Sequence, residues 1–424
     1  MTPTKKTGKM IVGIDDTDSA TRGMCTTYLA AVVAERVSSF ASVEDRLLVR
    51  LNPNVEHKTR GNAALALHLE TEAPERVEET VVEAVEENAV FDDEKTNPGV
   101  AFLRGEPSEE LAQYTVETVR EYKTRDEARS VADENDVRVH GWKNGRGIVG
   151  ATAAVGASRA LDDWTYELLV YREREEWGEP RRVSWDSFFD AHEATYPNTW
   201  DTVDEKTGEV VAVPNTHGPV VYGLRGTFDG VWEANSHVDV EGAERVAVYR
   251  TNQGTDAHII DASIGEVQDG GSYRVEGKVV EGPETREGGH VFFEIEDDKR
   301  LSCAAFEPTG RFRDTVRSLR EGDRVVVCGS VSEGTLKVEK LRVVSLNRTR
   351  HVKPTCCGRT MESAGHRQGY RCRNDDCDET AETLVEELVE RELEEGWYEV
   401  PPSARRHLAK PLVRLREPSR HETV

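Results

Sequence analysis

Three carboxylates stand within four residues near the start of the chain: Asp15, Asp16 and Asp18. They follow an apolar run at residues 10–14, and after a loop with Ser19 and Gly23 a helical pattern opens with Thr26 and Thr27. Carboxylates this close repel one another unless a cation lies between them. Mg²⁺ binds one or two carboxylates together with phosphate oxygens, and a helix N-terminus offers N–H groups to phosphate. The spacing predicts a metal–nucleotide site, although not a Walker A loop, whose G-x-x-x-x-G-K-[ST] pattern the sequence lacks.

A turn followed by a helix cap is the alternative interpretation, because Asp, Thr and Ser are ordinary turn and N-cap residues. One aspartate would favour it, whereas three together after an apolar strand favour function. Thr26 would be a plain N-cap in the first case. In the second it would lie beside a triphosphate and accept, or hydrogen-bond to, a phosphoryl group.

Three further polar stretches suit phosphate or metal: residues 57–62, 92–99 and 143–147. The first places two cations before a strand, and the last precedes a helical pattern. For each stretch taken alone, a solvated turn is the commoner explanation. Together with the loop and helix start above, they supply the candidate nucleotide-binding residues Ser19, Gly23, Thr27, Lys58, Thr59, Arg60, Asn62 and Lys95.

Four cysteines lie within 22 residues: Cys356, Cys357, Cys372 and Cys377. Two cysteine pairs separated by a glycine-containing loop are typical of a Cys₄ zinc ribbon. The spacing is irregular, because the first pair is adjacent and the second is C-x₄-C, where a zinc knuckle has C-x₂-C. Adjacent cysteines bind one tetrahedral ion only with backbone strain, so His351 and His366 are alternative ligands. Zn²⁺ is therefore a candidate cofactor.

The chain has 424 residues, with 55 Lys and Arg against 80 Asp and Glu and a formal charge of −25. Because the acidic residues are spread along the whole length, we interpret them as the surface of a protein from a salty, halophilic cytoplasm. At about 1 M salt the Debye length is only about 3 Å, so this charge does not exclude an RNA partner. No run of 18 apolar residues and no signal-peptide core occur, which predicts a cytoplasmic protein without a membrane partner.

The elements that must position these groups indicate a multidomain α+β protein. Helical patterns are expected at residues 26–37, 74–88 and 148–161, and strands at 10–14, 47–51, 64–69, 167–171, 220–225 and 245–250. Residues of about 125–265 fit a two-layer α+β sandwich. Five short strands between residues 273 and 343, with a helix at 312–319, predict an OB-fold β-barrel, a class that often binds oligonucleotides. The barrel could instead be a spacer. An acidic helix is expected at 379–395, packed on a neighbouring domain.

The ordered motifs resemble the archaeal isoleucine-tRNA 2-agmatinylcytidine synthetase family over nearly the whole chain. The segments that carry the resemblance are residues 13–19, 23–27, 51–53, 58–62, 92–99, 145–147, 214–216, 222–226, 251–252, 288–294, 303–309 and 398–408. The resemblance implies an ATP-dependent kinase-like catalytic domain (1–120), a ferredoxin-like domain (121–268), an OB fold (269–347), a zinc ribbon (348–380) and a C-terminal helix and tail (381–424).

The resemblance also implies the reaction. The family's enzyme joins agmatine to C2 of the wobble cytidine in the AUA-decoding isoleucine tRNA and consumes ATP. By carry-over, Asp15, Asp16 and Asp18 would hold Mg²⁺–ATP, and Thr26 matches the family's autophosphorylated threonine. Phosphorylation of the C2 oxygen would create a leaving group that an amine displaces. Two alternatives remain: a non-catalytic OB-fold and zinc-ribbon nucleic-acid-binding protein, which has no need of the aspartate cluster, and a different ATP-dependent nucleotide kinase.

Overall fold

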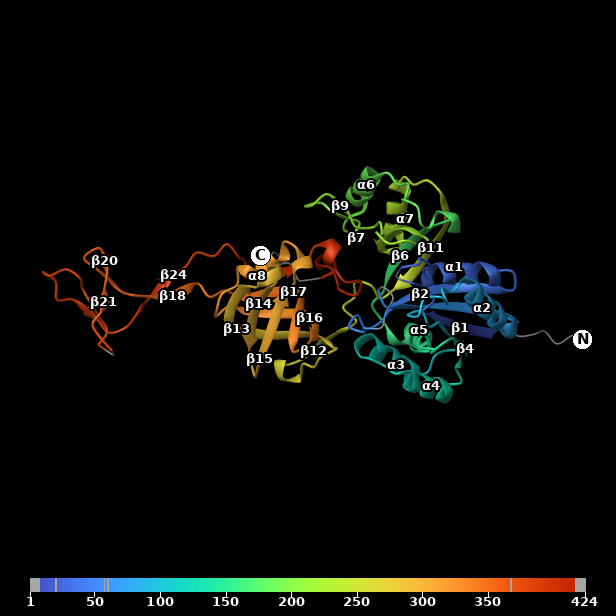
Figure 1. Cartoon of the computed structure of the whole chain (residues 1–424), viewed down its shortest axis with the longest axis horizontal. Coiled ribbons are helices and arrows are strands. Elements are labelled where there is room, and N and C mark those ends of the chain that lie inside the picture. The colour runs from blue at the N-terminus through green and yellow to red at the C-terminus, as the bar shows by residue number, and fades with distance from the viewer. Residues whose placement is uncertain (1–7, 20, 57, 59–60, 367, 416–424) are drawn as a thin grey trace, which may run out of the picture.

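The computed structural model describes residues 8–19, 21–56, 58, 61–366 and 368–415. A large helix-covered sheet, a barrel and a thin arm follow one another along the long axis of the molecule (Figure 1). No helix among these residues is long and apolar enough to cross a bilayer. The aspartate cluster belongs to the sheet and the four cysteines to the far end of the arm, so the two predicted sites are widely separated.

Nine strands form the sheet, in the order β5-β4-β1-β3-β2-β11-β6-β10-β7. All neighbours are antiparallel except β2 and β11, which run parallel with Leu48 beside Thr251. The sheet continues without a break across residue 120, where the sequence suggests a domain boundary. Its strands are β1 (Gly8–Asp15), β2 (Ala41–Arg50), β3 (Ala63–Thr71), β4 (Gly99–Arg104), β5 (Arg138–Gly141), β6 (Thr165–Arg172), β7 (Thr199–Trp200), β10 (Val220–Gly226) and β11 (Ala243–Thr251).

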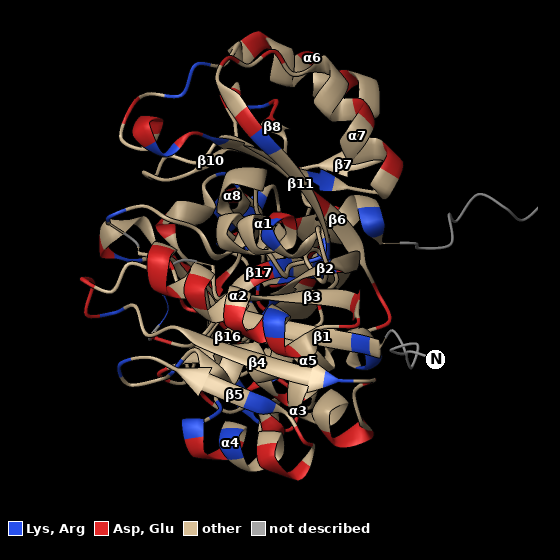
Figure 2. Ribbon diagram, turned by 90° about the vertical axis from the view of Figure 1, so that its right-hand side faces the viewer, with Lys and Arg blue, Asp and Glu red and all other residues tan. Residues whose placement is uncertain are grey.

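Helices cover the sheet on both faces. The predicted helices at residues 26–37 and 74–88 are confirmed as α1 (Thr26–Val37) and α2 (Pro74–Asn88), which pack on one face. On the other face α3 (Glu109–Arg120), α4 (Arg125–Glu134) and α5 (Ile148–Ala160) cover β1 to β5. Near β6 and β10 lie α6 (Trp185–Thr195) and α7 (Phe228–His237). Acidic positions mark the outer helices, α2 and α4 among them (Figure 2).

Helix α5 has a different neighbour from the one that the sequence suggests. The sequence places residues 148–161 in a second α+β unit, but α5 packs on β1, β3 and β4 of the first half. Small residues explain the close packing, because a Cβ at Gly13 of β1 would come 2.0 Å from the carbonyl oxygen of Ala151 in α5. The helix therefore lies directly against the strand that carries the aspartates.

A closed five-stranded barrel forms the second body. Its strands follow the order β13-β14-β15-β17-β16 and close through the pairing of β13 with β16, and α8 (Phe312–Arg317) lies between β15 and β16 in the chain. Apolar side chains of all five strands fill the interior. The strands are β13 (Ser272–Thr285), β14 (Val291–Glu296), β15 (Arg300–Ala305), β16 (Arg324–Ser332) and β17 (Thr335–Ser345), with β12 (Ile259–Asp261) and β25 (Gly396–Glu399) added at the edges.

The prediction of an acidic helix at residues 379–395 is wrong. This stretch contains β23 (Thr380–Ala381) and β24 (Val385–Leu388), and β24 pairs with β18 (Thr349–Val352) to form the arm. In this pairing Glu387 lies opposite Arg350 and forms an ion pair of 2.6 Å. A helix would instead stack glutamates three and four residues apart, where like charges repel. Cross-strand attraction therefore overrides the helical spacing of the leucines.

Short pairs of strands build the tip of the arm, and the chain then returns to the barrel. The tip strands are β19 (Thr355–Cys356), β20 (Arg359–Thr360), β21 (Glu362–Ser363) and β22 (Tyr370–Arg371). Beyond β25 the described chain forms single 3₁₀ turns at Pro402–Ala404 and Leu412–Arg414. The remaining small elements are β8 (Val203–Asp204), β9 (Glu209–Val210) and 3₁₀ turns at Arg174–Glu176, Ile264–Glu266, Glu287–Gly289 and Glu307–Thr309.

Candidate active site

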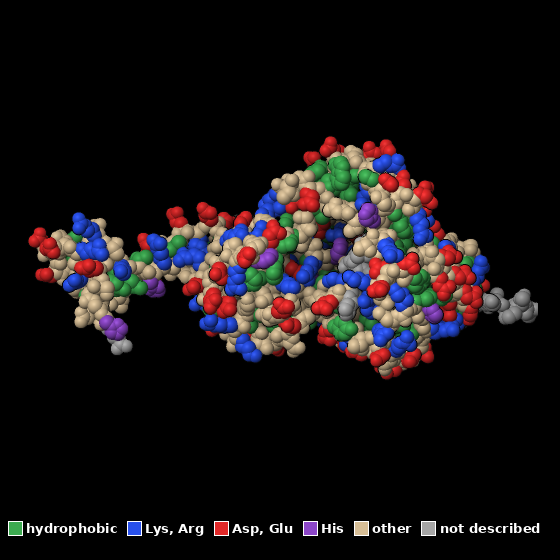
Figure 3. All heavy atoms as spheres, viewed as in Figure 1, with side chains coloured by type: hydrophobic (Ala, Val, Ile, Leu, Met, Phe, Trp, Pro, Cys, Tyr) green, Lys and Arg blue, Asp and Glu red, His purple; other side chains and the backbone are tan. Residues whose placement is uncertain are grey.

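A cleft of about 1030 Å³ opens at the end of β1, between the sheet and the C-terminal segment. The space-filling view shows the molecule hollowed where the sheet meets the barrel (Figure 3). Eight of the predicted site residues line this cleft: Asp15, Asp16, Asp18, Thr26, Thr27, Lys58, Asn62 and Lys95. The structure thus brings together residues from three separate sequence stretches, whose proximity the motifs only suggested.

Asp15 is the last residue of β1 and lies against α5. A Cβ at Gly150 of α5 would come 2.1 Å from the Asp15 carboxylate, so only glycine leaves room for this side chain. Burial and the charge of Asp16 raise the pKa of Asp15 well above its usual range. The helix that packs on β1 thereby confines the carboxylate at the edge of the cleft.

Asp16 adopts an unusual backbone conformation for a residue other than glycine, with a φ of 56°. Its carboxylate is nearly buried and accepts a hydrogen bond of 2.8 Å from Arg146. Burial raises the pKa of Asp16 to about 6, even though Arg146 acts in the opposite direction. Strained backbone of this kind concentrates at functional sites. Asp16 is therefore held in place with its negative charge only partly compensated.

The predicted metal ligands fit a cation. Asp15 and Asp16 lie beside Asp18 and have Arg146 as a neighbouring cation, yet both hold their protons more tightly than ordinary aspartates because their pKa values are raised. A divalent cation would displace those protons and relieve the repulsion between the carboxylates. The raised pKa values and the excess of negative charge suit a cation at this corner, and Mg²⁺ binding by Asp15 and Asp16 stays a prediction.

Thr26 begins helix α1, and Cys25 is the N-cap residue in its place. The cap interpretation of Thr26 is thus wrong, and its side chain is available for another role. The Thr17 hydroxyl donates to the Thr26 hydroxyl over 3.1 Å, inside the nearly buried base of the cleft. The N-terminus of α1 and the aspartates consequently border the same space. An anion at the helix N-terminus would therefore lie beside a cation at the aspartates.

Ser19 and Gly23 do not line the cleft. The Ser19 hydroxyl donates to Asp93 over 2.5 Å and accepts from the backbone N–H of Arg22 over 3.0 Å. Gly23 has a φ of 83° and its carbonyl accepts from the Ser19 N–H over 3.1 Å. Both residues shape the loop between β1 and α1, and their predicted contact with nucleotide stays a prediction.

The predicted phosphate-binding stretch at residues 57–62 is described only in part. Thr59 and Arg60 lie outside the described residues. Lys58 donates to the backbone carbonyl of Pro53, and burial followed by the charge of Arg406 lowers its pKa. Asn62 donates to the carbonyl of Asn52 over 2.8 Å, which fixes the end of the loop at the cleft. On the facing loop Lys95 is exposed.

A second group of charges, which we call the second wall, lines the same cleft; the motif analysis named the segments 222–226 and 398–408 that contribute to it, but assigned their side chains no role. Glu167 of β6 is almost fully buried and pairs with Arg50 at 3.6 Å and with Arg225 at 3.2 Å. Asp201 pairs with Arg405 from the C-terminal segment. One signal was available, because Glu167 directly precedes the apolar run of residues 168–171 in a buried strand, where a charge needs a partner.

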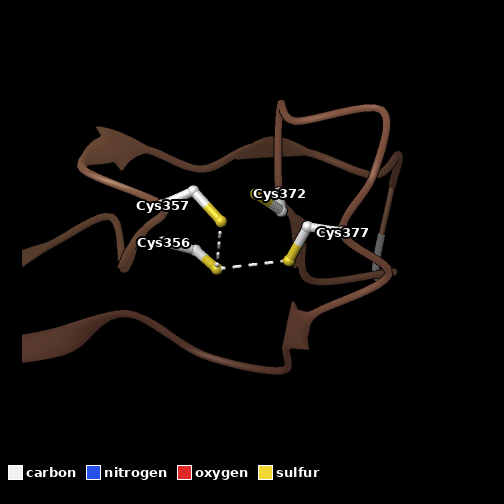
Figure 4. A group of neighbouring side chains, drawn as sticks. All are labelled: Cys356, Cys357, Cys372 and Cys377. Carbon is white, nitrogen blue, oxygen red and sulfur yellow. Dashed lines mark hydrogen bonds between the residues drawn. The ribbon is translucent and has the colours of Figure 1, made fainter.

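The four cysteine sulfurs at the tip of the arm converge, all within 4.8 Å of one another (Figure 4). Cys356 lies 3.9 Å from Cys357 and 3.6 Å from Cys377. Tetrahedral zinc with Zn–S bonds of about 2.3 Å separates its sulfurs by about 3.8 Å, so these residues fit the ion. Cys357 has a φ of 49°, the backbone strain expected when adjacent cysteines face one centre.

The alternative histidine ligands are not part of this group. His351 lies in β18 and faces Glu386 at 3.7 Å, and His366 is exposed on the loop between the cysteine pairs. Neither joins the four-sulfur cluster. The irregular spacing therefore still yields a complete set of four thiol ligands.

Three family models match segments of the chain: the TiaS TCKD domain at residues 11–74, the TiaS FLD domain at 145–258 and the TiaS C-terminal zinc ribbon domain at 353–393. The chain is 47% identical over 422 residues to the isoleucine-tRNA 2-agmatinylcytidine synthetase TiaS of Methanosarcina acetivorans, covering 96% of this chain and 98% of that protein. It is 42% identical to the protein of the same name from Haloquadratum walsbyi, with 95% and 97% covered.

Solved structures agree in fold over the whole length. The complex of TiaS with its isoleucine tRNA and ATP has a TM-score of 0.88 at 43% identity, covering 98% of this chain and 99% of that one. The complex of TiaS with the same tRNA, AMPCPP and agmatine has a TM-score of 0.87 at 41% identity, with 98% and 99% covered. These structures pair the same fold with a nucleotide and a tRNA, and the second adds agmatine.

Proposed function

The chain belongs to the isoleucine-tRNA 2-agmatinylcytidine synthetase family, TiaS, and from this premise we propose that it joins agmatine to C2 of the wobble cytidine of the AUA-decoding isoleucine tRNA at the expense of ATP. It is thus an enzyme that forms a C–N bond and changes the CAU anticodon to read AUA. The convergence of three carboxylates and the start of α1 in one cleft carries this proposal.

The aspartate corner is the proposed site of phosphoryl transfer. Asp15 and Asp16 would hold Mg²⁺, Asp18 would add negative charge nearby, and Thr26, which lines the same cleft, would accept or hydrogen-bond the phosphoryl group. Mg²⁺ bound here would neutralise charge on the phosphate oxygens. Arg146 keeps the Asp16 carboxylate in a fixed direction before any ligand arrives, because it also donates to the carbonyl of Lys95 over 2.8 Å. The N-terminus of α1 adds a favourable electrostatic environment for phosphate.

The chemistry requires activation of a poor electrophile. The C2 carbonyl of cytosine does not react with an amine by itself, and a phosphoryl group on its oxygen turns that oxygen into a leaving group. The ammonium of agmatine first gives up a proton to solvent, the free amine attacks C2, and the nitrogen loses a second proton as the C–O bond breaks and phosphate departs. Agmatine is a dication, so its guanidinium needs a pocket that bears a carboxylate without a partner cation in the protein, and we expect that pocket to lie in this cleft.

The barrel and the arm are the proposed grip on the tRNA. The closed order β13-β14-β15-β17-β16, with β15 and β17 parallel and α8 between β15 and β16, is that of an OB fold, which binds oligonucleotides. The cysteine cluster at the tip would hold Zn²⁺ and thereby fix the short strands around it. The target base must leave the anticodon loop to enter the cleft.

The environment in which the enzyme works is a further part of the proposal. All seven cysteines are free, which suits a reducing cytoplasm. The chain has 80 acidic residues against 55 Lys and Arg, and such an acidic surface suits molar salt. At such ionic strength contacts with tRNA depend on short-range hydrogen bonds and stacking more than on long-range attraction.

Transfer of labelled agmatine tests the proposed function directly. The chain is incubated with ATP, Mg²⁺, radiolabelled agmatine and the unmodified isoleucine tRNA, and the tRNA is recovered. We expect label in this tRNA, and none when ATP is left out or when the wobble cytidine is replaced by uridine. Tight tRNA binding without any label would instead support the non-catalytic nucleic-acid-binding alternative.

A further inference from the structure

The chain beyond the arm returns across the molecule and fastens the barrel to the sheet. We call residues 400–414 the strap; they follow β25, which pairs with β17 of the barrel. The carbonyl of His407 accepts from the N–H of Gly254 over 2.8 Å, and Lys410 pairs with Asp163 at 2.9 Å. The strap is therefore a built part of the cleft region.

Four strap residues line the cleft, and two of them, Arg405 and His407, carry a basic side chain; the others are Pro402 and Ser403. Arg405 pairs with Asp201 and, at 2.6 Å, with Glu399. His407 accepts a hydrogen bond of 2.8 Å from Arg225 through its Nδ1. The strap thus contributes one residue that is locked between two carboxylates and one that touches an arginine of the cleft wall.

His407 stands at one end of a continuous chain of contacts. Arg225 donates to Glu167 over 3.2 Å, Glu167 accepts from Gln253 over 2.5 Å, and Arg50 lies 3.6 Å from the same carboxylate. The two arginines and Glu167 all line the cleft. The Arg225 guanidinium is therefore directed by two carboxylates, Glu167 at 3.2 Å and Asp201 at 3.7 Å, and by its hydrogen bond to His407.

The same imidazole also limits the loop that carries Lys58 and Asn62. A Cβ at Gly61 would come 2.8 Å from His407 Cδ2 and 2.5 Å from an Arg50 nitrogen. Arg50 in turn donates to the carbonyl of Gly61 over 3.4 Å. Gly61 consequently rests on His407 and Arg50, and a displaced imidazole would shift both Gly61 and Arg225.

We infer that His407 is a positioning residue for the agmatine-transfer reaction: its Nδ1 orients Arg225 and its ring supports Gly61, so that the strap completes the cleft. This inference rests on the proposed function. Burial, followed by the charges of Arg50 and Arg225, lowers the pKa of His407 well below its usual range. The ring is therefore neutral at physiological pH, with Nδ1 available as the acceptor and the proton on Nε2.

Three substitutions separate the acceptor from the bulk of the side chain. His407→Asn places a carbonyl oxygen where Nδ1 lies, His407→Gln places its amide near the position of Nε2, and His407→Leu keeps volume without an acceptor. Asp163→Asn is the matched control, because it weakens the strap's contacts with Lys410 and Arg414 at a residue that does not line the cleft.

The full-length variants are compared in the labelled-agmatine assay, with kcat and the KM values for ATP and agmatine measured separately and thermal stability recorded for each. We expect His407→Leu and His407→Gln to lower kcat by about 10- to 100-fold, the usual effect of a small misplacement near reacting groups. We expect His407→Asn to recover most of kcat and Asp163→Asn to leave it within about twofold, because only the acceptor position at the cleft matters.

Each other outcome contradicts the inference. If His407→Leu stays within about twofold of the unaltered chain, the imidazole positions nothing. If His407→Asn loses as much as His407→Leu, or if Asp163→Asn does, the residue only fastens the strap. Failure of the unaltered chain to label the tRNA would instead refute the proposed function, and the two failures are therefore distinguished within one experiment.

Discussion

At one wall of the cleft three aspartates lie beside Arg146, whereas at the other wall two carboxylates lie among three arginines. The carboxylates of the second wall are Glu167 and Asp201, and the arginines are Arg50, Arg225 and Arg405. Buried charge is costly unless it is paired. The first wall is therefore suited to take up a cation, and the second is already paired within the protein.

Burial raises the pKa of a carboxylate in both walls, since the pKa of Asp201 is also raised despite the charges of Arg405 and Arg225, so the walls differ chiefly in how many cations pair with their carboxylates. Burial raises the pKa of Asp16 to about 6 although Arg146 opposes the shift. Glu167, by contrast, receives hydrogen bonds from Arg225 and Gln253. A wall with uncompensated negative charge is stabilised most when a cationic ligand binds. A wall whose charges are already paired keeps its structure without a ligand. We interpret the first as the site of reaction and the second as its scaffold.

The largest expected effect concerns the balanced wall. Glu167→Gln leaves Arg50 and Arg225 without their shared anion, and breaking a buried pair in this way costs about 3–5 kcal/mol of unfolding free energy. The measurement is denaturant unfolding followed by tryptophan fluorescence. Glu106→Gln, which removes the exposed partner of Lys9, is the control and should leave the midpoint unchanged. An equal midpoint for Glu167→Gln would show that this wall is not a scaffold.

Asp16→Asn should lower the catalytic activity rather than the free energy of unfolding. We expect agmatine transfer and ATP turnover to fall by about 100- to 1000-fold, because the substitution removes a charge that must act on the transferred phosphoryl group. Binding of the isoleucine tRNA should persist, as a filter-binding assay would show. The folded state should be no less stable, in contrast to Glu167→Gln, because the substitution relieves repulsion. ATP turnover at the unaltered rate would contradict the catalytic assignment.

The pH dependence of stability provides a smaller effect with a definite sign. The pKa of Asp16 is about 6 in the folded protein, against a normal value of 3.8. Between these pH values the folded state binds more protons than the unfolded state, so the metal-free protein loses stability as pH rises through this window. Relative to Asp16→Asn, the unaltered chain should lose about 1–3 kcal/mol between about pH 4 and pH 7 in the presence of a chelator.

Added Mg²⁺ should restore that stability at neutral pH, because the cation takes the place of the lost proton. The comparison is made at about pH 7.5 with Mg²⁺ and with chelator, for the unaltered chain and for Asp16→Asn. A rise in unfolding midpoint that is the same in both proteins would show that the aspartate wall does not bind the cation.

Thr17→Val should have the smallest effect. It removes the hydroxyl that donates to Thr26 in the buried base of the aspartate wall. One hydrogen bond is worth about 0.5–1.5 kcal/mol, so we expect roughly a two- to tenfold decrease of kcat. Thr17→Ser keeps the hydroxyl and should retain the activity, as steady-state kinetics would show. A similar loss in both variants would assign the effect to packing.

Local patterns in the chain were sufficient for several elements. Residues 26–37 and 74–88 form the predicted helices, since Val77, Val81, Ala84 and Val85 recur at helical spacing and bury one face. The barrel strands alternate inward and outward as their period of two predicts. The helix prediction for residues 379–395 was wrong, because the structure of this stretch depends on its pairing with Arg350 and His351 of a strand that is distant in the sequence.

The sequence by itself placed the three aspartates together, because residues within a few positions of one another must be neighbours in any fold, and it indicated the cysteine cluster through the two-pair pattern of a zinc ribbon. Only the tertiary structure decided the second wall, whose members Arg50, Glu167, Arg225 and His407 come from three strands and the strap. Their meeting depends on the parallel pairing of β2 with β11 and on the return of the chain past the barrel. Contacts between such distant segments follow from the order of strands and the packing of whole bodies, which no short motif encodes.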